Sequence, residues 1–174
     1  MRTKSRLVAL AVATLAMWAT AAHAASGLPL PLQAALISKL VHYDRSLPGD
    51  PGAIKMLIVY QQKTPENDQL REGLQKLGVH SELVGADQLA TWAGDVNIVY
   101  LMPDVPIEAA RQFAEKHKAL SLTGSAELAE KGQVAVALSK GADDRPEIVV
   151  HLARLGVEKH EFAASLLGLA RVVR

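Results

Sequence analysis

The stretch Ala119–Leu138, ALSLTGSAELAEKGQVAVAL, decides the fold class. It begins with a short apolar run over Ala119–Thr123 and ends with another over Gln133–Leu138, as is typical of strands buried on both faces. Between them, Ser125 is an N-cap candidate for a brief helix that Gly132 ends. So short a crossover predicts neighbouring strands of a helix-covered sheet. Nothing in the stretch forms a nucleophile motif, a metal-ligand set or a complete phosphate loop.

The first 24 residues have the three parts of a secretory leader. Arg2, Lys4 and Arg6 form a basic start, Leu7–Ala22 is an uncharged and mostly apolar run, and Ala22-His23-Ala24 is an A-x-A cleavage site. The apolar run is shorter than the roughly 20 residues that a membrane span requires. We therefore expect cleavage after Ala24, a periplasmic location and no membrane insertion after cleavage.

The remaining chain has the size and charge of one ordinary domain. Removing 24 of the 174 residues leaves 150, and the loss of three basic residues moves the formal net charge from +1 to −2. A nucleic-acid binder would carry a basic stripe, so no nucleic-acid partner is expected. The chain contains no cysteine, so burial of apolar side chains must stabilise it. We expect a single domain over residues 25–174.

Apolar runs and helix signals alternate along this domain. An amphipathic helix is expected over Leu32–Arg45, a helix with Thr64 as its N-cap follows the first strand, a loose helical turn covers Gly85–Trp92, and a further helix covers Ile107–His117. In addition to the two runs of the opening stretch, strands are expected over four segments: Ala53–Tyr60, Val79–Val84, Asp95–Met102 and Glu147–His151.

The C-terminal end of the domain is expected to differ from the rest. The polar turn Ser139–Arg145 is too short for a parallel crossover, so the strands on either side of it should pair antiparallel at one edge. The last part of the chain is expected to be a helix with one buried face, formed by Phe162, Leu166, Leu169, Ala170 and Val173. The sequence thus predicts a three-layer α/β fold: a Rossmann-like, mostly parallel sheet of about five or six strands flanked by helices, with an antiparallel edge strand at the C-terminal end.

Four polar residues follow the expected parallel strands. Because open α/β sheets bind ligands beyond the carboxyl ends of their strands, Thr64, Asp104, Thr123 and Ser125 are candidates for a ligand cleft. Two simpler interpretations remain open: a stiff turn accounts for Asp104 between two prolines, and capping accounts for Ser125.

No catalytic residue, cofactor site or metal site is predicted. Asp143 and Asp144 are adjacent carboxylates, but solvated charge is usual in a turn. No serine lies in a G-x-S-x-G elbow, and the histidines are not spaced as zinc ligands. We expect a protein without enzymatic activity.

Across Leu32–Val173 the order of elements resembles the YfiR family of periplasmic proteins. The resemblance rests on LQAALISKLVHYDRSLP, AIKMLIVY, RQFAEKHKALSLTGSAELAEKGQVAVAL and IVVHLARLGVEKHEFAASLLGLARVV, the last with its Leu-Leu-x-Leu-Ala motif. The chain departs from the family pattern at Leu47, where a tryptophan is usual, at Lys131 before Gly132, where the family has Gly-Gly, and at His151, where the family commonly has asparagine. It also lacks the family's cysteines.

The resemblance implies a regulator that binds the periplasmic sensor domain of an inner-membrane diguanylate cyclase and inhibits it, which lowers cyclic di-GMP signalling and biofilm formation. It also implies a homodimer and, in some systems, an outer-membrane lipoprotein that sequesters the inhibitor. Leu167 and Val172 are candidates for the partner or dimer surface. The alternative hypothesis is a periplasmic small-ligand-binding module, similar to half of a periplasmic binding protein, with its cleft at the strand ends.

Overall fold

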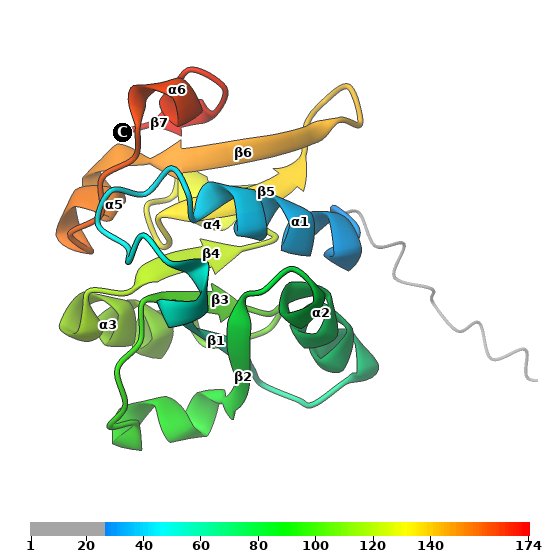
Figure 1. Ribbon diagram of the computed structural model, residues 1–174, viewed down its shortest axis with the longest axis vertical. Helices are drawn as coiled ribbons and strands as arrows, with labels where there is room; N and C mark the ends of the chain where they lie inside the picture. The colour runs from blue at the N-terminus through cyan, green and yellow to red at the C-terminus, as the bar shows by residue number, and fades with distance from the viewer. Residues whose placement is uncertain (1–26) are drawn as a thin grey trace, which may run out of the picture.

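The computed structural model describes residues 27–174, so the expected leader and its cleavage site lie outside the described residues. One seven-stranded sheet, in the order β2-β1-β3-β4-β5-β6-β7, runs through the molecule (Figure 1). Its strands are β1 (Lys55–Tyr60), β2 (His80–Gly85), β3 (Ile98–Leu101), β4 (Leu120–Thr123), β5 (Val136–Lys140), β6 (Pro146–His151) and β7 (Arg171–Val173). The helices are α1 (Leu30–Leu40), α2 (Pro65–Lys76), α3 (Ile107–His117), α4 (Ala126–Glu130), α5 (Leu152–Val157) and α6 (Ala164–Leu167), with 3-10 turns η1 (Pro51–Ala53) and η2 (Ala86–Thr91).

The strand directions confirm the predicted fold class. Strands β1 to β5 pair in parallel, β6 pairs antiparallel with β5, and β7 pairs in parallel with β6. The antiparallel end of the sheet therefore has two strands, and β7, which the sequence did not predict, forms the outer edge. The sheet has seven strands where about five or six were expected.

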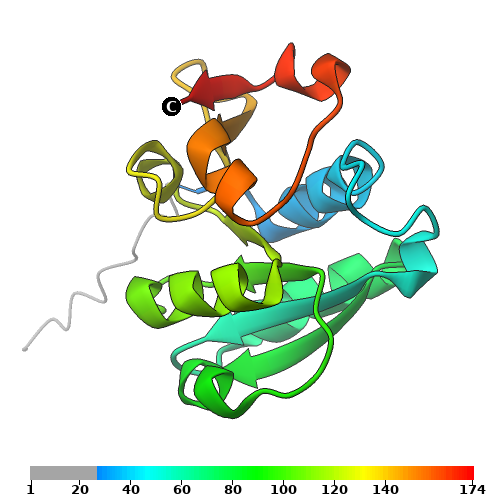
Figure 2. The same cartoon turned by 90° about the vertical axis from the view of Figure 1, so that its left-hand side faces the viewer.

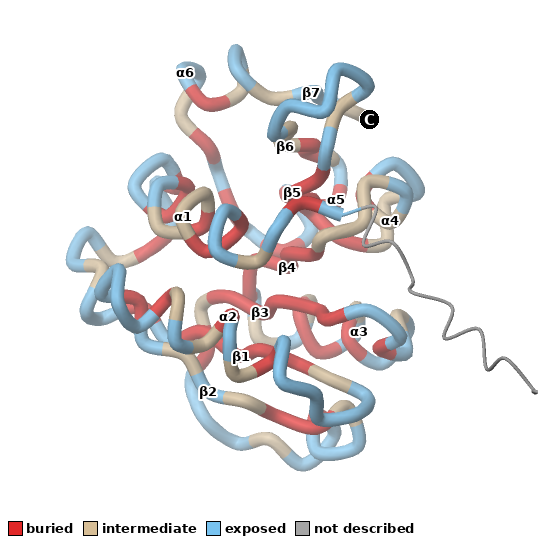
Figure 3. Tube along the Cα trace, turned by 90° about the vertical axis from the view of Figure 1, so that its right-hand side faces the viewer, coloured by how far each residue is buried: buried red, intermediate tan, exposed pale blue. Residues whose placement is uncertain are grey.

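Helices cover both faces of the sheet. Helices α1 and α2 lie on one face, and α3, α4 and α5 lie on the other (Figures 1 and 2). Every residue of β3 and β4 is buried, which explains why their sequences are nearly continuous apolar runs (Figure 3). The polar exceptions are Ser121 and Thr123 in β4, and both are hydrogen-bonded.

Several element boundaries differ from the prediction, and two of these differences have identifiable reasons. Strand β5 begins at Val136 rather than at Gln133, because the backbone N–H of Ala135 donates to Ser121 Oγ at 2.7 Å. Helix α1 ends at Leu40 rather than at Arg45, because Asp44 leaves the helix and forms an isolated β-bridge with Phe162.

The predicted C-terminal helix is wrong. The segment forms two short helices, α5 and α6, and then strand β7. Phe162 and Leu166 are buried as expected, whereas Leu169 is 80% exposed. The physical reason is tertiary: the backbone of residues 171–173 pairs with Val149, Val150 and His151 of β6, and two β-branched valines favour that extended conformation.

Candidate functional site

The fold places the four candidate cleft residues at the same edge of the sheet. Strands β1, β3 and β4 are parallel. Thr123 is the last residue of β4, and Thr64, Asp104 and Ser125 each follow the carboxyl end of one of the three strands. Thr64 and Asp104 are exposed, and Asp104 has a left-handed backbone with φ of 68°. The sequence therefore located the edge correctly.

Three of these residues form hydrogen bonds within the protein. The Thr123 hydroxyl donates to the Leu101 carbonyl oxygen at 3.2 Å, and the Ser125 N–H donates to Thr123 Oγ1 at 3.4 Å. Ser125 occupies the N-cap position of α4, as predicted, but its side chain accepts no capping hydrogen bond. At the start of α2, the Thr64 N–H donates to Asn67 Oδ1 at 2.6 Å, which confirms Thr64 as the N-cap residue.

Side chains of the protein fill this edge beside β3 and β4. The buried Tyr100 hydroxyl donates to Gln33 Oε1, and Gln33 Nε2 donates to the Leu28 carbonyl oxygen at 2.6 Å. A Cβ on Gly124 would lie 3.3 Å from both the Gln33 amide and the Tyr100 hydroxyl. Burial raises the pKa of Tyr100 far above its usual value, so the phenol remains a neutral donor. The start of α1 thus fills the part of this edge next to Gly124, while Thr64 and Asp104 remain exposed.

Two open hollows lie instead near the amino ends of β1 and β3. One, of about 560 Å³, is lined by residues that include Lys55, Arg71 and Trp92, and the other, of about 400 Å³, also includes Lys55. Lys55 Nζ is 3.3 Å from an Asp95 carboxylate oxygen, and an Arg71 nitrogen is 2.7 Å from Asp68. The cations at these hollows are already paired, and no sequence prediction pointed to them.

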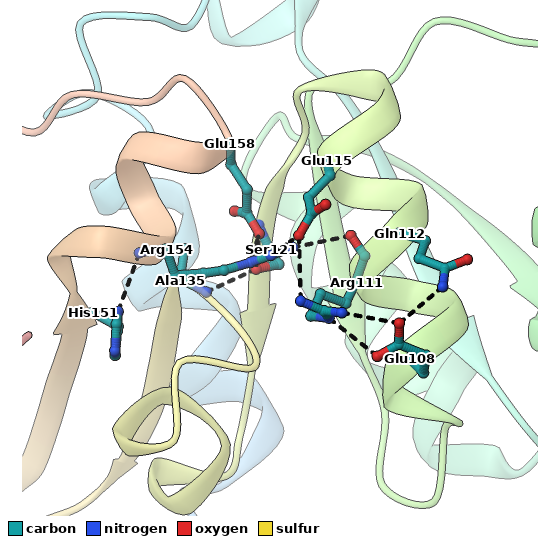
Figure 4. Close-up of polar contacts among 9 residues, drawn as sticks. All are labelled: Glu108, Arg111, Gln112, Glu115, Ser121, Ala135, His151, Arg154 and Glu158. Atoms are coloured by element: carbon teal, nitrogen blue, oxygen red, sulfur yellow. Dashed lines mark hydrogen bonds and ion pairs between the residues drawn. The ribbon is translucent and has the colours of Figure 1, made fainter.

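A buried charged cluster joins β4 to the region of α5 (Figure 4). The Glu158 carboxylate accepts hydrogen bonds from the Ser121 N–H at 2.9 Å, the Ser121 hydroxyl at 2.6 Å and Arg154 Nε at 2.8 Å. Ser121, Arg154 and Glu158 are all at most 4% exposed. Burial raises the pKa of Glu158, while the bonds from Ser121 and the Arg154 charge oppose that rise.

The same arginine extends the cluster to α3. Arg154 pairs with Glu115 through one terminal nitrogen, and its other terminal nitrogen donates to the Arg111 carbonyl oxygen at 3.0 Å (Figure 4). All three of its donor nitrogens are therefore bound within the protein. The Ser121 hydroxyl donates to a carboxylate and accepts from Ala135, so it is not an available nucleophile. The cluster fastens α3, β4 and α5 together.

Sequence reasoning missed this cluster. Arg154 and Glu158 have the i, i+4 spacing of a helical ion pair, and Ser121 interrupts an apolar strand. Both signals can be recognised in the sequence. The hydrogen bond between Ser121 and Glu158 cannot, because the two residues are 37 positions apart in the chain.

The His151 ring lies close to the backbone of Gly132. Gly132 has φ of 66°, and a Cβ on it would lie 2.8 Å from His151 Nε2. The opposite ring nitrogen, His151 Nδ1, accepts the Arg154 N–H at 3.1 Å and caps α5. The His151 ring therefore lies between Gly132 and the first turn of α5.

The adjacent carboxylates of the β5–β6 turn form surface ion pairs. Asp144 lies 2.7 Å from Lys140 Nζ, and Asp143 lies 3.3 Å from Arg145 Nε. Within residues 27–174, no group of three or more His, Cys, Asp or Glu side chains is arranged to hold a metal ion. No helix in that part of the chain has the length and apolar character needed to cross a bilayer.

The candidate partner residues lie at the β7 end of the molecule. Leu167 is half-buried and packs against the core, and Val172 is 37% exposed. Leu169, which was expected to face the sheet, is the most exposed large apolar residue among those described.

No family model matches the sequence, and no curated protein matches it. Among solved structures, a conserved domain protein from Vibrio cholerae has a TM-score of 0.63 at 13% identity, and an ABC domain in complex with L-Trp from Streptococcus pneumonia has a TM-score of 0.60 at 15% identity. Each match covers 84% of this chain and 60% of the other, so this chain spans about 60% of the length of those proteins. At such identities the likeness establishes the fold alone.

Proposed function

We propose that the chain is a periplasmic regulatory protein that binds the sensor domain of an inner-membrane diguanylate cyclase and keeps its output low. The proposal rests on the resemblance of Leu32–Val173 to the YfiR family, together with the leader-like first 24 residues. It makes the protein a binding protein without catalysis, able to form a homodimer and, in some systems, to be sequestered by an outer-membrane lipoprotein.

The observation that carries the proposal is the apolar surface at the sheet edge. Strand β7 pairs on one side only, and Leu169 and Val172 expose apolar side chains there. Arg171 lies between them, and its guanidinium pairs with two carboxylates, those of Glu130 at 2.7 Å and Glu147 at 3.1 Å. An unpaired strand edge with exposed apolar side chains suits an extended segment of a protein partner.

The buried polar groups support binding over catalysis. The Arg154 and Glu158 charges are paired within the protein, and Gln33 and Tyr100 fill the strand-end edge next to Gly124. What the molecule presents to a partner is therefore its surface rather than a reactive cavity.

The test is direct binding to the cyclase. The periplasmic domain of a GGDEF-containing membrane protein encoded beside this chain would be immobilised, and the leader-free protein would be titrated over it. The proposal expects saturable binding at micromolar concentration or tighter, and a fall in cyclic di-GMP when both are expressed. Absence of binding at 100 micromolar would contradict it.

A second candidate is the small-ligand-binding module. The carboxyl ends of β1, β3 and β4 share one edge, where ligands of open α/β sheets bind. A thermal-shift screen of metabolites discriminates, because a ligand at 100 times its Kd stabilises by about 2.7 kcal/mol. A hit that Asp104→Ala abolishes would favour this candidate, and a negative panel would favour the regulator.

A further inference from the structure

Asp44 and His160 form a second buried polar pair, separate from the Arg154 cluster. Asp44 follows α1 and His160 follows α5, and both side chains are at most 4% exposed. His160 Nδ1 is 2.6 Å from Asp44 Oδ2, and His160 Nε2 is 3.0 Å from the Lys118 carbonyl oxygen. The other Asp44 oxygen accepts the Ser46 N–H at 2.8 Å.

The two contacts of the His160 ring can both be hydrogen bonds only if the pair holds enough protons. A carbonyl oxygen only accepts, so His160 Nε2 carries a proton. A contact of 2.6 Å between Nδ1 and a carboxylate oxygen needs another proton between them. A neutral imidazole next to an ionised carboxylate has one proton too few for both bonds, so both can form together only when the pair shares one additional proton.

The pair fastens the C-terminal segment to the loop after α1. The Arg45 N–H donates to the Glu161 carbonyl oxygen at 2.9 Å, and the Ala163 N–H donates to the Tyr43 carbonyl oxygen at 2.9 Å. These bonds flank the bridge between Asp44 and Phe162. Helix α6 and strand β7 follow directly, and β7 has only three paired residues in its register with β6.

We propose that Asp44 and His160 are a proton-dependent latch that controls how tightly α6 and β7 are held. When the shared proton leaves, one of the two His160 hydrogen bonds must break, because either tautomer of the neutral ring directs a lone pair at an acceptor. The segment at residues 161–163 then loosens, and the β7 edge opens more often. Acidic surroundings close the latch and alkaline surroundings release it.

The other charged and titratable groups on the three segments around the pair include the exposed His42, two residues before Asp44, and the half-buried His117, next to Lys118. Arg45 and Glu161 pair with each other at 3.0 Å, with side chains 64% and 68% exposed. Lys118 contributes its carbonyl group, and Lys159 precedes His160; both are exposed lysines with left-handed backbones. Among the charged side chains of these segments, the Asp44 carboxylate is the one hydrogen-bonded to the His160 ring.

The latch is tested by hydrogen exchange of the Ala163, Val172 and Val173 amides from pH 5 to pH 9, expressed as protection factors. The same samples report the protonation of the His160 ring through its Cε1–H NMR shift. The proposal expects protection to fall about tenfold as the ring loses its proton, the factor for one buried hydrogen bond. Protection that does not follow the ring overturns it.

Asp44→Asn is the decisive variant. Its carboxamide accepts from Ser46 and donates to a neutral His160, so both histidine bonds survive without the shared proton. Protection should then be high and independent of pH, while His42→Gln, at an exposed histidine nearby, should behave as wild type. If Asp44→Asn does not fold, His160→Gln must likewise abolish the pH dependence. A pH dependence that persists in the folded variant overturns the latch.

Discussion

Arg154 Nε lies 2.8 Å from Glu158 Oε1, although the two side chains are only 4% and 0% exposed. Removing two charges from water is expensive, and such a pair is tolerated only when its remaining donors and acceptors are satisfied. Here Ser121 supplies two donors to the carboxylate, and the Arg111 carbonyl takes one donor of the guanidinium. The pair is therefore one component of a complete network.

Arg154→Met should be strongly destabilising. It leaves the Glu158 carboxylate buried without its cation, which typically costs about 3–5 kcal/mol. Urea unfolding followed by circular dichroism measures the loss. Arg171→Met is the matched control, because Arg171 also pairs with two carboxylates but is 40% exposed, and it should cost no more than about 1 kcal/mol. Equal losses for the two variants would contradict the role assigned to Arg154.

His117 should make the fold less stable in acid. Burial lowers the pKa of His117, with a smaller contribution from the charge of Lys116, and the ring stacks on Phe113 with centroids 4.3 Å apart. The unfolded chain, with a histidine pKa near 6.5, thus binds protons at a pH where the folded chain does not. This contribution to stability is complete above that value and is lost as the pH falls below it towards the lowered pKa.

The measurement is the free energy of unfolding at pH 7.5 and at pH 5, for wild type and for His117→Gln. The variant should show a smaller drop on acidification, whereas His42→Gln, at an exposed site, should show the full drop. A drop that is identical in all three proteins would exclude His117 as its source.

The sequence predicted the parts of the fold whose signal is local. Strands β3 and β4 are buried on both faces, so their sequences are mostly apolar, with Ser121 and Thr123 as the polar exceptions. The antiparallel pairing of β5 with β6 followed from the short polar turn between them. The shared edge of Thr64, Asp104 and Thr123 followed from parallel topology alone.

What the sequence could not predict depends on long-range contacts. The apolar spacing of Phe162, Leu166 and Leu169 fits a helix, but pairing with β6 draws residues 171–173 into a strand. The hydrogen bond that fills the edge next to Gly124 joins Gln33 and Tyr100, which are 67 residues apart in the chain. Ser125 had the right residue type for a cap, yet nothing local determined where its hydroxyl would point.

The surface proposed for partner binding should tolerate substitution. Leu169 is 80% exposed, so Leu169→Ser should change the free energy of unfolding by no more than about 0.5 kcal/mol. The same variant, especially combined with Val172→Ser, should weaken binding to the cyclase domain at least tenfold. Leu77→Ser, at an exposed leucine that ends α2, is the control for loss of apolar surface elsewhere. Equal binding by the Leu169 and Leu77 variants would rule out the β7 surface.

The contact between Gly132 and His151 should appear as an energetic coupling. Gly132→Ala introduces a Cβ 2.8 Å from His151 Nε2 and forces alanine into a left-handed backbone, whereas Gly78→Ala meets only the backbone cost, because nothing lies within 4 Å of its Cβ. That backbone cost is roughly 1–2 kcal/mol, and Gly132→Ala should exceed it. Urea unfolding of Gly132→Ala, His151→Ala and the double variant should give a coupling of at least about 0.5 kcal/mol, since the second substitution removes the ring that the new methyl group strikes. Additive losses, or equal costs at the two glycines, would show that the His151 ring moves aside freely and does not restrict residue 132.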